Sequence, residues 1–325
     1  MSGTKSTAEH LEAVAAWLKS LGLGNGNDRL HLYASEIQKP PPISPPASLL
    51  EVAQWGFIHL EAFEFISIHR AYKGLEDATL IGKLEKALKG CRELVNESRK
   101  NNDPRNTMFE LALAAELKLR GVDVQLCEPD LMVTFPKGQY GIACKRPYNE
   151  GGIRRNVRDA KDQLQANLKP DQHGVIAVSL SRIVNPGNRL LGVHVGSRNT
   201  EGAIHGSLQV DLRRHSLELM KRLGSISFSS KTLALMFDVS TPCLIENGDM
   251  HFAHASQFYP IDEPKRIVGK FLGFRQIPPA FTYLNDIMGD EVLNTTFSPD
   301  AQAEIESMNR NSRIPVNVGH IIIGE

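Results

Sequence analysis

The residues best placed to do chemistry lie at the ends of a short apolar hairpin. Residues 131–135 and 140–144 are apolar enough to form two strands, and a Lys-Gly pair between them can turn the chain. Asp130 stands just before the first strand, and a basic pair that begins at Lys145 ends the second. Polar residues at both ends of such a hairpin suggest a site at one rim of a sheet. An ordinary hairpin with solvated ends shows the same pattern, so spacing alone leaves both interpretations open.

With its neighbours, this hairpin resembles the core motif of the PD-(D/E)XK nuclease superfamily. In that family a Pro-Asp pair, a short hairpin and an acid-x-Lys follow a helix that carries a glutamate. Pro129-Asp130 matches the first element, Lys145 matches the lysine, and Glu110 matches the helix acid. The resemblance covers roughly residues 105–180. It implies an α/β fold with a central mixed β-sheet flanked by helices, the restriction-endonuclease-like core.

The resemblance also implies roles for these residues in phosphodiester hydrolysis. A hard divalent cation, Mg²⁺ or Mn²⁺, would activate the water and hold the phosphate, and such cations prefer carboxylate oxygens. Asp130 would bridge metal and phosphate, and Glu110 would complete or support the metal shell. Lys145 would stabilise the pentavalent phosphate or orient the water. Some family members carry a glutamine on the helix after the lysine strand, which here is Gln163 or Gln165.

One position departs from the family pattern. Two residues before the lysine the family has Glu or Asp, whereas this chain has Ala143. Residues 143 and 145 share a face of the strand, and a methyl group cannot bind Mg²⁺, so one anionic ligand is missing. Three explanations are open: an engineered inactive variant, a natural relative that has lost catalysis, or replacement by another acid, Glu128 or Glu116. The survival of the other motif residues favours the first.

The helix expected at about residues 154–168 is rich in basic side chains. Four of them are spaced i, i+1, i+4 and i+7, which we interpret as one helix face. Because this helix follows the lysine strand directly, contact with backbone phosphates is favoured over a merely solvated surface. The candidate nucleic-acid-binding residues are Arg146, Arg154, Arg155, Arg158 and Lys161.

These features lead us to expect a Mg²⁺-dependent nuclease whose site is disabled at position 143. The resemblance to the family favours DNA over RNA as the substrate. It also favours a role in restriction or antiviral defence. The alternative is a catalytically inactive nuclease-like module that binds nucleic acid or scaffolds a protein complex. A third interpretation is a metal-independent binding protein in which the Pro-Asp hairpin is a coincidence. A protein partner or a homo-oligomer is compatible with each of them.

Composition limits the other classes of function. The chain has 325 residues and a formal net charge of +0, so any contact with nucleic acid must come from a local basic patch. No apolar run approaches the roughly 20 residues that a membrane span needs, and no signal peptide is evident. The four cysteines are far apart without a CxxC pair, which indicates reduced thiols in a cytoplasmic protein.

Periodicity predicts three parts of the chain. Residues 1–100 should be a helical N-terminal region, residues 101–260 the nuclease-like α/β core, and residues 261–325 an extension packing on that core. The N-terminal region is expected to contain helices at 7–21, 48–72 and 76–99 and a Pro-rich connector at 39–46.

The core pattern is a helix, three short strands, a second helix and a buried strand, followed by a loop and further elements. The expected segments are a helix at 105–120, a strand at 122–126, the hairpin, a helix at 154–168, a strand at 174–180, a loop at 185–200, a helix at 206–223, a strand at 231–239, a hairpin around Asn247-Gly248, a helix near 299–309 and an apolar run at 321–323. A helix between two apolar strands favours a parallel β-α-β crossover. His251 and His254 lie on a predicted strand facing opposite ways, which argues against a shared metal.

Overall fold

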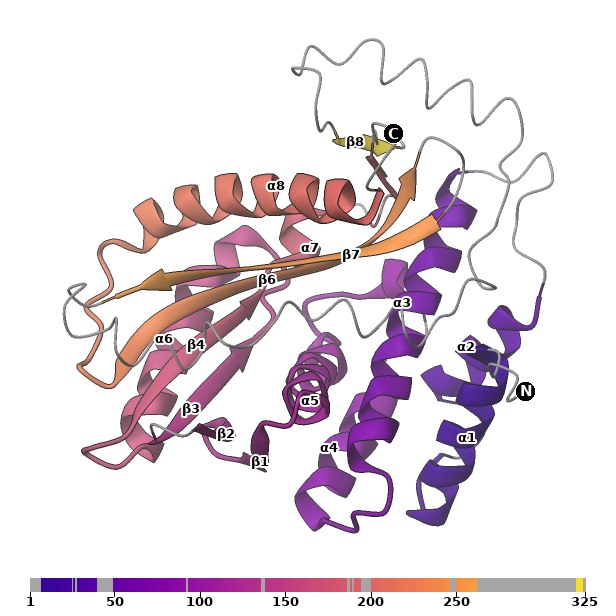
Figure 1. Ribbon diagram of the computed structural model, residues 1–325, viewed down its shortest axis with the longest axis horizontal. Coiled ribbons are helices and arrows are strands. Elements are labelled where there is room, and N and C mark those ends of the chain that lie inside the picture. Colours follow the sequence, from indigo (N-terminus) through magenta and orange to yellow (C-terminus); the bar gives the residue numbers. More distant parts are fainter. Residues whose placement is uncertain are drawn as a thin grey trace.

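The fold belongs to the expected α/β class, with N-terminal helices followed by a mixed sheet that has helices packed against it. A computed structural model of the chain describes residues 7–24, 26, 28–39, 49–91, 93–135, 138–185, 188, 190–193, 200–245, 250–261 and 320–323. Helices α3, α4 and α5 lie on one side of the sheet, and α6 and α8 lie on the other (Figure 1). None of the helices in these ranges is both long and apolar enough to cross a membrane.

The N-terminal region folds into helices, as predicted. They are α1 (Thr7–Ser20), α2 (Arg29–Ile37), α3 (Leu49–Tyr72) and α4 (Ala78–Leu88), followed by a 3₁₀ turn at Leu94–Asn96. Helix α2 was not predicted, although Asp28 caps its start by accepting a hydrogen bond from the His31 amide. The helix predicted at 76–99 is wrong in length: α4 ends before Gly90, whose φ of +101° stops a helix. Apart from Lys39, the Pro-rich connector lies outside the described residues.

The described strands form one mixed sheet in the order β1-β2-β3-β4-β6-β5-β8, and β7 pairs with β6. Strands β1 to β3 are antiparallel, whereas β3, β4 and β6 run parallel. The predicted hairpin and the parallel crossover through α6 are therefore confirmed. The strands are β1 (Asp123–Cys127), β2 (Asp130–Phe135), β3 (Gly138–Lys145), β4 (His173–Ser179), β5 (Leu190–Val193), β6 (Thr232–Ile245), β7 (Met250–Pro260) and β8 (His320–Ile323).

The remaining helices are α5, α6, a short α7 and α8. Their bounds are Asp103–Leu119, Glu150–Asn167, Ser181–Val184 and Thr200–Leu223. Helix α6 lies very close to the sheet because two strand residues beneath it are glycines, which have no side chain. A Cβ atom on Gly141 would come within 2.7 Å of Leu168 Cδ2, and one on Gly174 within 2.6 Å of Leu164 Cδ2. This close approach brings the inner face of α6 to the end of β3.

Alternation along the strands divides the core between the two faces of the sheet. One apolar cluster joins Ile142 and Cys144 of β3 to the N-terminal helices and α5. The other joins Ala143 to α6, α8 and the opposite faces of β4 and β6. Successive residues at the end of β3 therefore face different helices. For that reason Lys145 and Arg146 enter different environments.

The later part of the chain differs from the sequence expectation in one element. The segment 185–200, predicted to be a loop, contains β5, which pairs with β6 and with β8 from the far end of the chain. Of the predicted extension, only Ile261 and strand β8 belong to the described residues. The expected helix near 299–309 and the turn at Asn247-Gly248 lie outside them.

Candidate functional site

Three of the predicted site residues meet at the rim of the sheet where β2 begins and β3 ends. The Lys145 ammonium donates to Gln163 Oε1 over 2.7 Å and lies 3.6 Å from Asp130 Oδ2. Gln163 Nε2 donates to Asp130 Oδ1 over 2.9 Å and to the Glu128 carboxylate over 3.0 Å. The Cys144 amide donates to Asp130 Oδ2 over 2.7 Å, which fixes the aspartate against the strand. Gln163, rather than Gln165, points into the site.

Glu110 approaches the same rim from α5 on the other side of the sheet. Its carboxylate accepts a hydrogen bond of 2.6 Å from Lys83 of α4, a residue that the motif does not include. Burial raises the pKa of Glu110, and the negative charge of Asp130 raises it further, while Lys83 and Lys145 oppose the shift. Burial alone would lower the pKa of Lys83, but the charge and hydrogen bond of Glu110 raise it overall. These four groups therefore form one electrostatic cluster.

Ala143 stands at the position where the expected nuclease motif would have its second acid. The last register pair between β2 and β3 is Leu131 with Ile142, so one further step would set Asp130 opposite Ala143. Residues opposite each other on antiparallel strands have Cβ atoms about 5 Å apart. The Ala143 side chain is fully buried beneath α6, against residues that include Val157 and Ala160. A carboxylate here would lie beside Asp130, but it would enter a tightly packed space.

The donor set at this rim does not fit a Mg²⁺ site. Both oxygens of Asp130 already accept hydrogen bonds, and Glu110 is paired with a lysine. Two carboxylates face two ammonium groups, so the cluster lacks the excess negative charge that holds a hard dication. In the described residues no group of three or more His, Cys, Asp or Glu side chains could hold a metal ion. Glu128 is an additional acid that contacts the cluster through the Gln163 amide.

The basic residues of α6 do not all lie together. At about 100° per residue, Arg154, Arg158 and Lys161 fall within about 60° of one another, but Arg155 is turned by about 100° from Arg154. The first three lie about 140–180° around the helix from Gln163, so they face away from the rim. Arg154 donates to Ser225 Oγ, next to the end of α8, over 2.6 Å.

Arg146 is separate from the other predicted nucleic-acid-binding residues. It is buried, lies on the opposite face of the sheet from α6, and forms a two-point ion pair with Glu97. Because its guanidinium group is held by a carboxylate, the expected contact with phosphate does not fit this position. The role of Arg146 in phosphate binding stays a prediction that its burial and its two-point pair do not favour.

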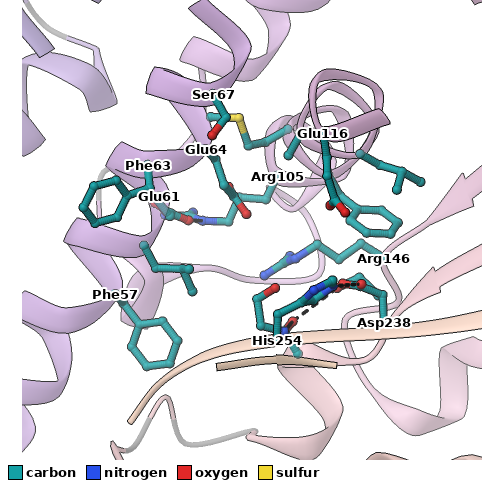
Figure 2. Close-up of a pocket in the computed structure, with 18 of the residues that line it drawn as sticks. Phe57, Glu61, Phe63, Glu64, Ser67, Arg105, Glu116, Arg146, Asp238 and His254 are labelled. Carbon is teal, nitrogen blue, oxygen red and sulfur yellow. Dashed lines mark hydrogen bonds and ion pairs between the residues drawn. The ribbon is translucent and has the colours of Figure 1, made fainter. Parts of the chain in front are cut away.

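Sequence reasoning missed a cavity of about 140 Å³ on the Arg146 side of the sheet. It lies between α3, α5, the carboxyl ends of β3 and β4, and the middle of β6 and β7 (Figure 2). Its wall includes Glu61, which accepts hydrogen bonds from Arg105 Nε over 2.5 Å and Nη2 over 3.1 Å. Burial would raise the pKa of Glu61, but Arg105 and Arg29 lower it to about 2.

The floor of the cavity carries a second polar cluster. Asp238 of β6 pairs with His254 of β7 and accepts a hydrogen bond of 2.9 Å from Ser256 Oγ. Burial alone would lower the pKa of His254, but Asp238 raises it overall. The same ring nitrogen of His254 faces both Asp238 and Ser256. A serine-histidine-aspartate relay needs the two ring nitrogens to serve different partners, so this cluster is not one.

No single sequence motif could have revealed this cavity, because its residues come from elements spread over residues 57–254. Comparisons of the chain with protein-family models, with curated proteins and with solved structures give no match. The likeness to the PD-(D/E)XK nucleases therefore stays a prediction from the short sequence motif.

Proposed function

We propose that this chain is a PD-(D/E)XK nuclease-like protein that binds nucleic acid, DNA in preference to RNA, through a hydrolytic site disabled at Ala143. The observation that carries the proposal is the convergence of Asp130, Lys145 and Gln163 around position 143. The resemblance assigns these residues to the cleavage of phosphodiesters. Their arrangement retains a cation for the phosphate but not the acids for a metal.

The electrostatics of the rim support binding without hydrolysis. Lys145 and Lys83 each lie beside a carboxylate, and a phosphate group could take over either ammonium by competing with that partner. The Lys145 side chain is 19% exposed, which leaves its ammonium accessible from the rim. Without a third carboxylate at position 143, the water that attacks phosphorus has no metal to activate it.

The second candidate is an active nuclease in which Glu128 supplies the missing acid. The observation that favours it is the shared contact of Glu128 and Asp130 with the Gln163 amide. Rotation of that amide would free both carboxylates on the same side of the rim. The other acid that the sequence offered, Glu116, lies on the cavity side with Asp238 and His254 among its neighbours, so it does not serve this purpose.

Fluorescence anisotropy with labelled single-stranded and double-stranded DNA and RNA tests the proposal. Lys145→Ala should weaken binding by roughly 10- to 150-fold, since a charged hydrogen bond to phosphate contributes about 1.5–3 kcal/mol. Lys89→Ala is the matched control, because this exposed lysine pairs only with Glu85 among the described residues and should leave binding unchanged. Equal loss in both variants would show non-specific charge attraction, and absence of binding would refute the proposal.

Plasmid cutting by the unaltered chain separates the two candidates. The disabled-site proposal expects no cutting in either Mg²⁺ or Mn²⁺, with DNA binding retained. Cutting that EDTA stops and Glu128→Gln abolishes would establish the second candidate instead. A variant at the exposed Glu93 serves as the acid control.

A further inference from the structure

The cavity behind the sheet contains one carboxyl group without a partner. Glu61 is held by arginines, Glu116 lies 3.2 Å from Arg120, and Asp238 pairs with His254. In the part of the chain that the structure describes, Glu64 makes no hydrogen bond or ion pair with another residue. Figure 2 shows the side chains of Glu64 and Glu116 directed into the same space from α3 and α5. A half-buried polar group without a protein partner calls for an explanation, and a bound ligand is one.

The other residues that line the cavity indicate which kind of ligand would fit it. Much of the lining is apolar or aromatic, and includes Phe57, Phe63 and Leu113. The guanidinium groups of Arg105 and Arg146 are already held by two-point pairs with Glu61 and Glu97, so they are not available to an anion. Arg120 also lines the cavity and is held by Glu116 through Nη2, while its Nη1 has no hydrogen-bond partner among the described residues. Among the carboxyl groups of the lining, Glu64 is the one that no described residue holds.

The size of the cavity agrees with a small ligand. Its volume of about 140 Å³ is roughly ten times the 10–15 Å³ that one water needs. Apolar walls with a few convergent polar groups are the usual composition of a small-molecule site. A lone water would leave most of the aromatic wall without contact.

We propose that this cavity binds a small organic cation, with its ammonium or guanidinium group on Glu64 and Glu116 and its apolar part against the aromatic side chains of α3 and α5. The proposal is independent of the nucleic-acid function, because the cavity lies on the opposite face of the sheet from Lys145 and Gln163. It also accounts for a half-buried carboxyl group that no described residue holds.

Calorimetric titration with benzylammonium, benzyl alcohol and benzoate tests the proposal, since these probes share a ring and differ in charge. Benzylammonium should bind with a dissociation constant of about 1 mM or tighter, as expected for a fragment of this size. Benzyl alcohol should bind at least tenfold more weakly, and benzoate should not bind. Glu64→Gln should remove the preference for the cation, whereas Glu51→Gln, an exposed site on the same helix, should keep it.

Proton release provides a second readout. At pH 7 the binding of benzylammonium should release close to one proton, which titration in buffers of different ionisation enthalpy measures, because burial keeps Glu64 protonated in the empty cavity. The charged or titratable groups that line the cavity beside Glu64 are Glu61, Arg105, Glu116, Arg120, Arg146, Asp238 and His254. Release that persists in Glu64→Gln would assign the proton to one of them and overturn the role given to Glu64.

A variant with a larger side chain inside the cavity provides a second test if Glu64→Gln does not fold. Ala112→Leu extends a lining side chain of α5 into the cavity and should abolish binding of all three probes. Unchanged binding of benzylammonium by Ala112→Leu or Glu64→Gln would overturn the proposal. Equal affinity for the alcohol and the ammonium, or no binding of any probe to the unaltered chain, would do so as well.

Discussion

Glu64→Gln should make the free energy of unfolding less dependent on pH. Burial raises the pKa of Glu64 from 4.5 to about 8, and the charge of Glu61 adds to the shift against Arg146, Arg29 and Arg105. An acid whose pKa is raised in the folded state costs nothing below pH 4.5. As the pH rises from 4.5 towards 8, the unfolded chain releases this proton and the folded chain keeps it, so stability falls.

The size of the effect follows from the shift. One pKa unit corresponds to about 1.4 kcal/mol, so the full shift is worth at most about 5 kcal/mol above pH 8. Between pH 5 and pH 7 the upper value is about 2.5 kcal/mol. Water in the cavity screens the charge, so we expect a change of about 1–2 kcal/mol over this interval.

Urea unfolding at pH 5, 6, 7 and 8 measures the difference between the unaltered chain and Glu64→Gln. The difference should grow with pH in favour of the variant, because glutamine has no proton to lose. Subtracting the two curves removes the titration of His254, Glu110 and other groups that are common to both. Glu51→Gln should run parallel to the unaltered chain. A Glu64→Gln difference that is constant across this range, or that shrinks as the pH rises, would refute the burial argument.

Three further changes test how the elements are held. Gly174→Ala should destabilise the fold by several kcal/mol in urea unfolding, because its Cβ would lie 2.6 Å from a backbone oxygen. The control Gly82→Ala, at an exposed helix position, should stabilise the fold by about 0.5–1 kcal/mol. Similar values for the two variants would contradict the close packing of α6 on the sheet. Glu61→Gln should cost about 3–5 kcal/mol by leaving buried arginines unpaired, and a loss below about 1 kcal/mol would argue against that pairing. Asn149→Ala removes the N-cap hydrogen bond to the Gly152 amide and should lower stability by about 1 kcal/mol, and an unchanged unfolding midpoint would argue against the cap.

Local patterns in the sequence predict the hairpin and the crossover well. The apolar strands, the Gly-containing turn and the capped α6 are all specified within about 20 residues of one another. Helix α2 was missed because it is short and its cap, Asp28, is the main local signal. Strand β5 was missed because it has only four residues and its partner β8 comes from the opposite end of the chain.

Some residues of the candidate site could likewise be predicted from local sequence, whereas others could not. Asp130, Lys145 and Gln163 could be found because a contiguous motif carries them on neighbouring elements. Lys83 could not, since α4 reaches Glu110 only through the packing of helices against the sheet. Arg146 was grouped with the basic residues of α6 by its position in the sequence, but strand alternation turns it to the other face, where Glu97 holds it. The cavity around Glu64 depends wholly on tertiary packing.

The most direct test of the central claim is plasmid cutting after an acid is restored at position 143. Ala143→Asp and Ala143→Glu are both needed, because the site is tightly packed and the shorter acid fits more easily; thermal melting confirms that each is folded. We predict cutting in Mg²⁺ or Mn²⁺ that EDTA stops and that Lys145→Ala abolishes. A folded acid variant that binds DNA but cuts nothing with either metal would contradict the claim that a nuclease site lies at this rim.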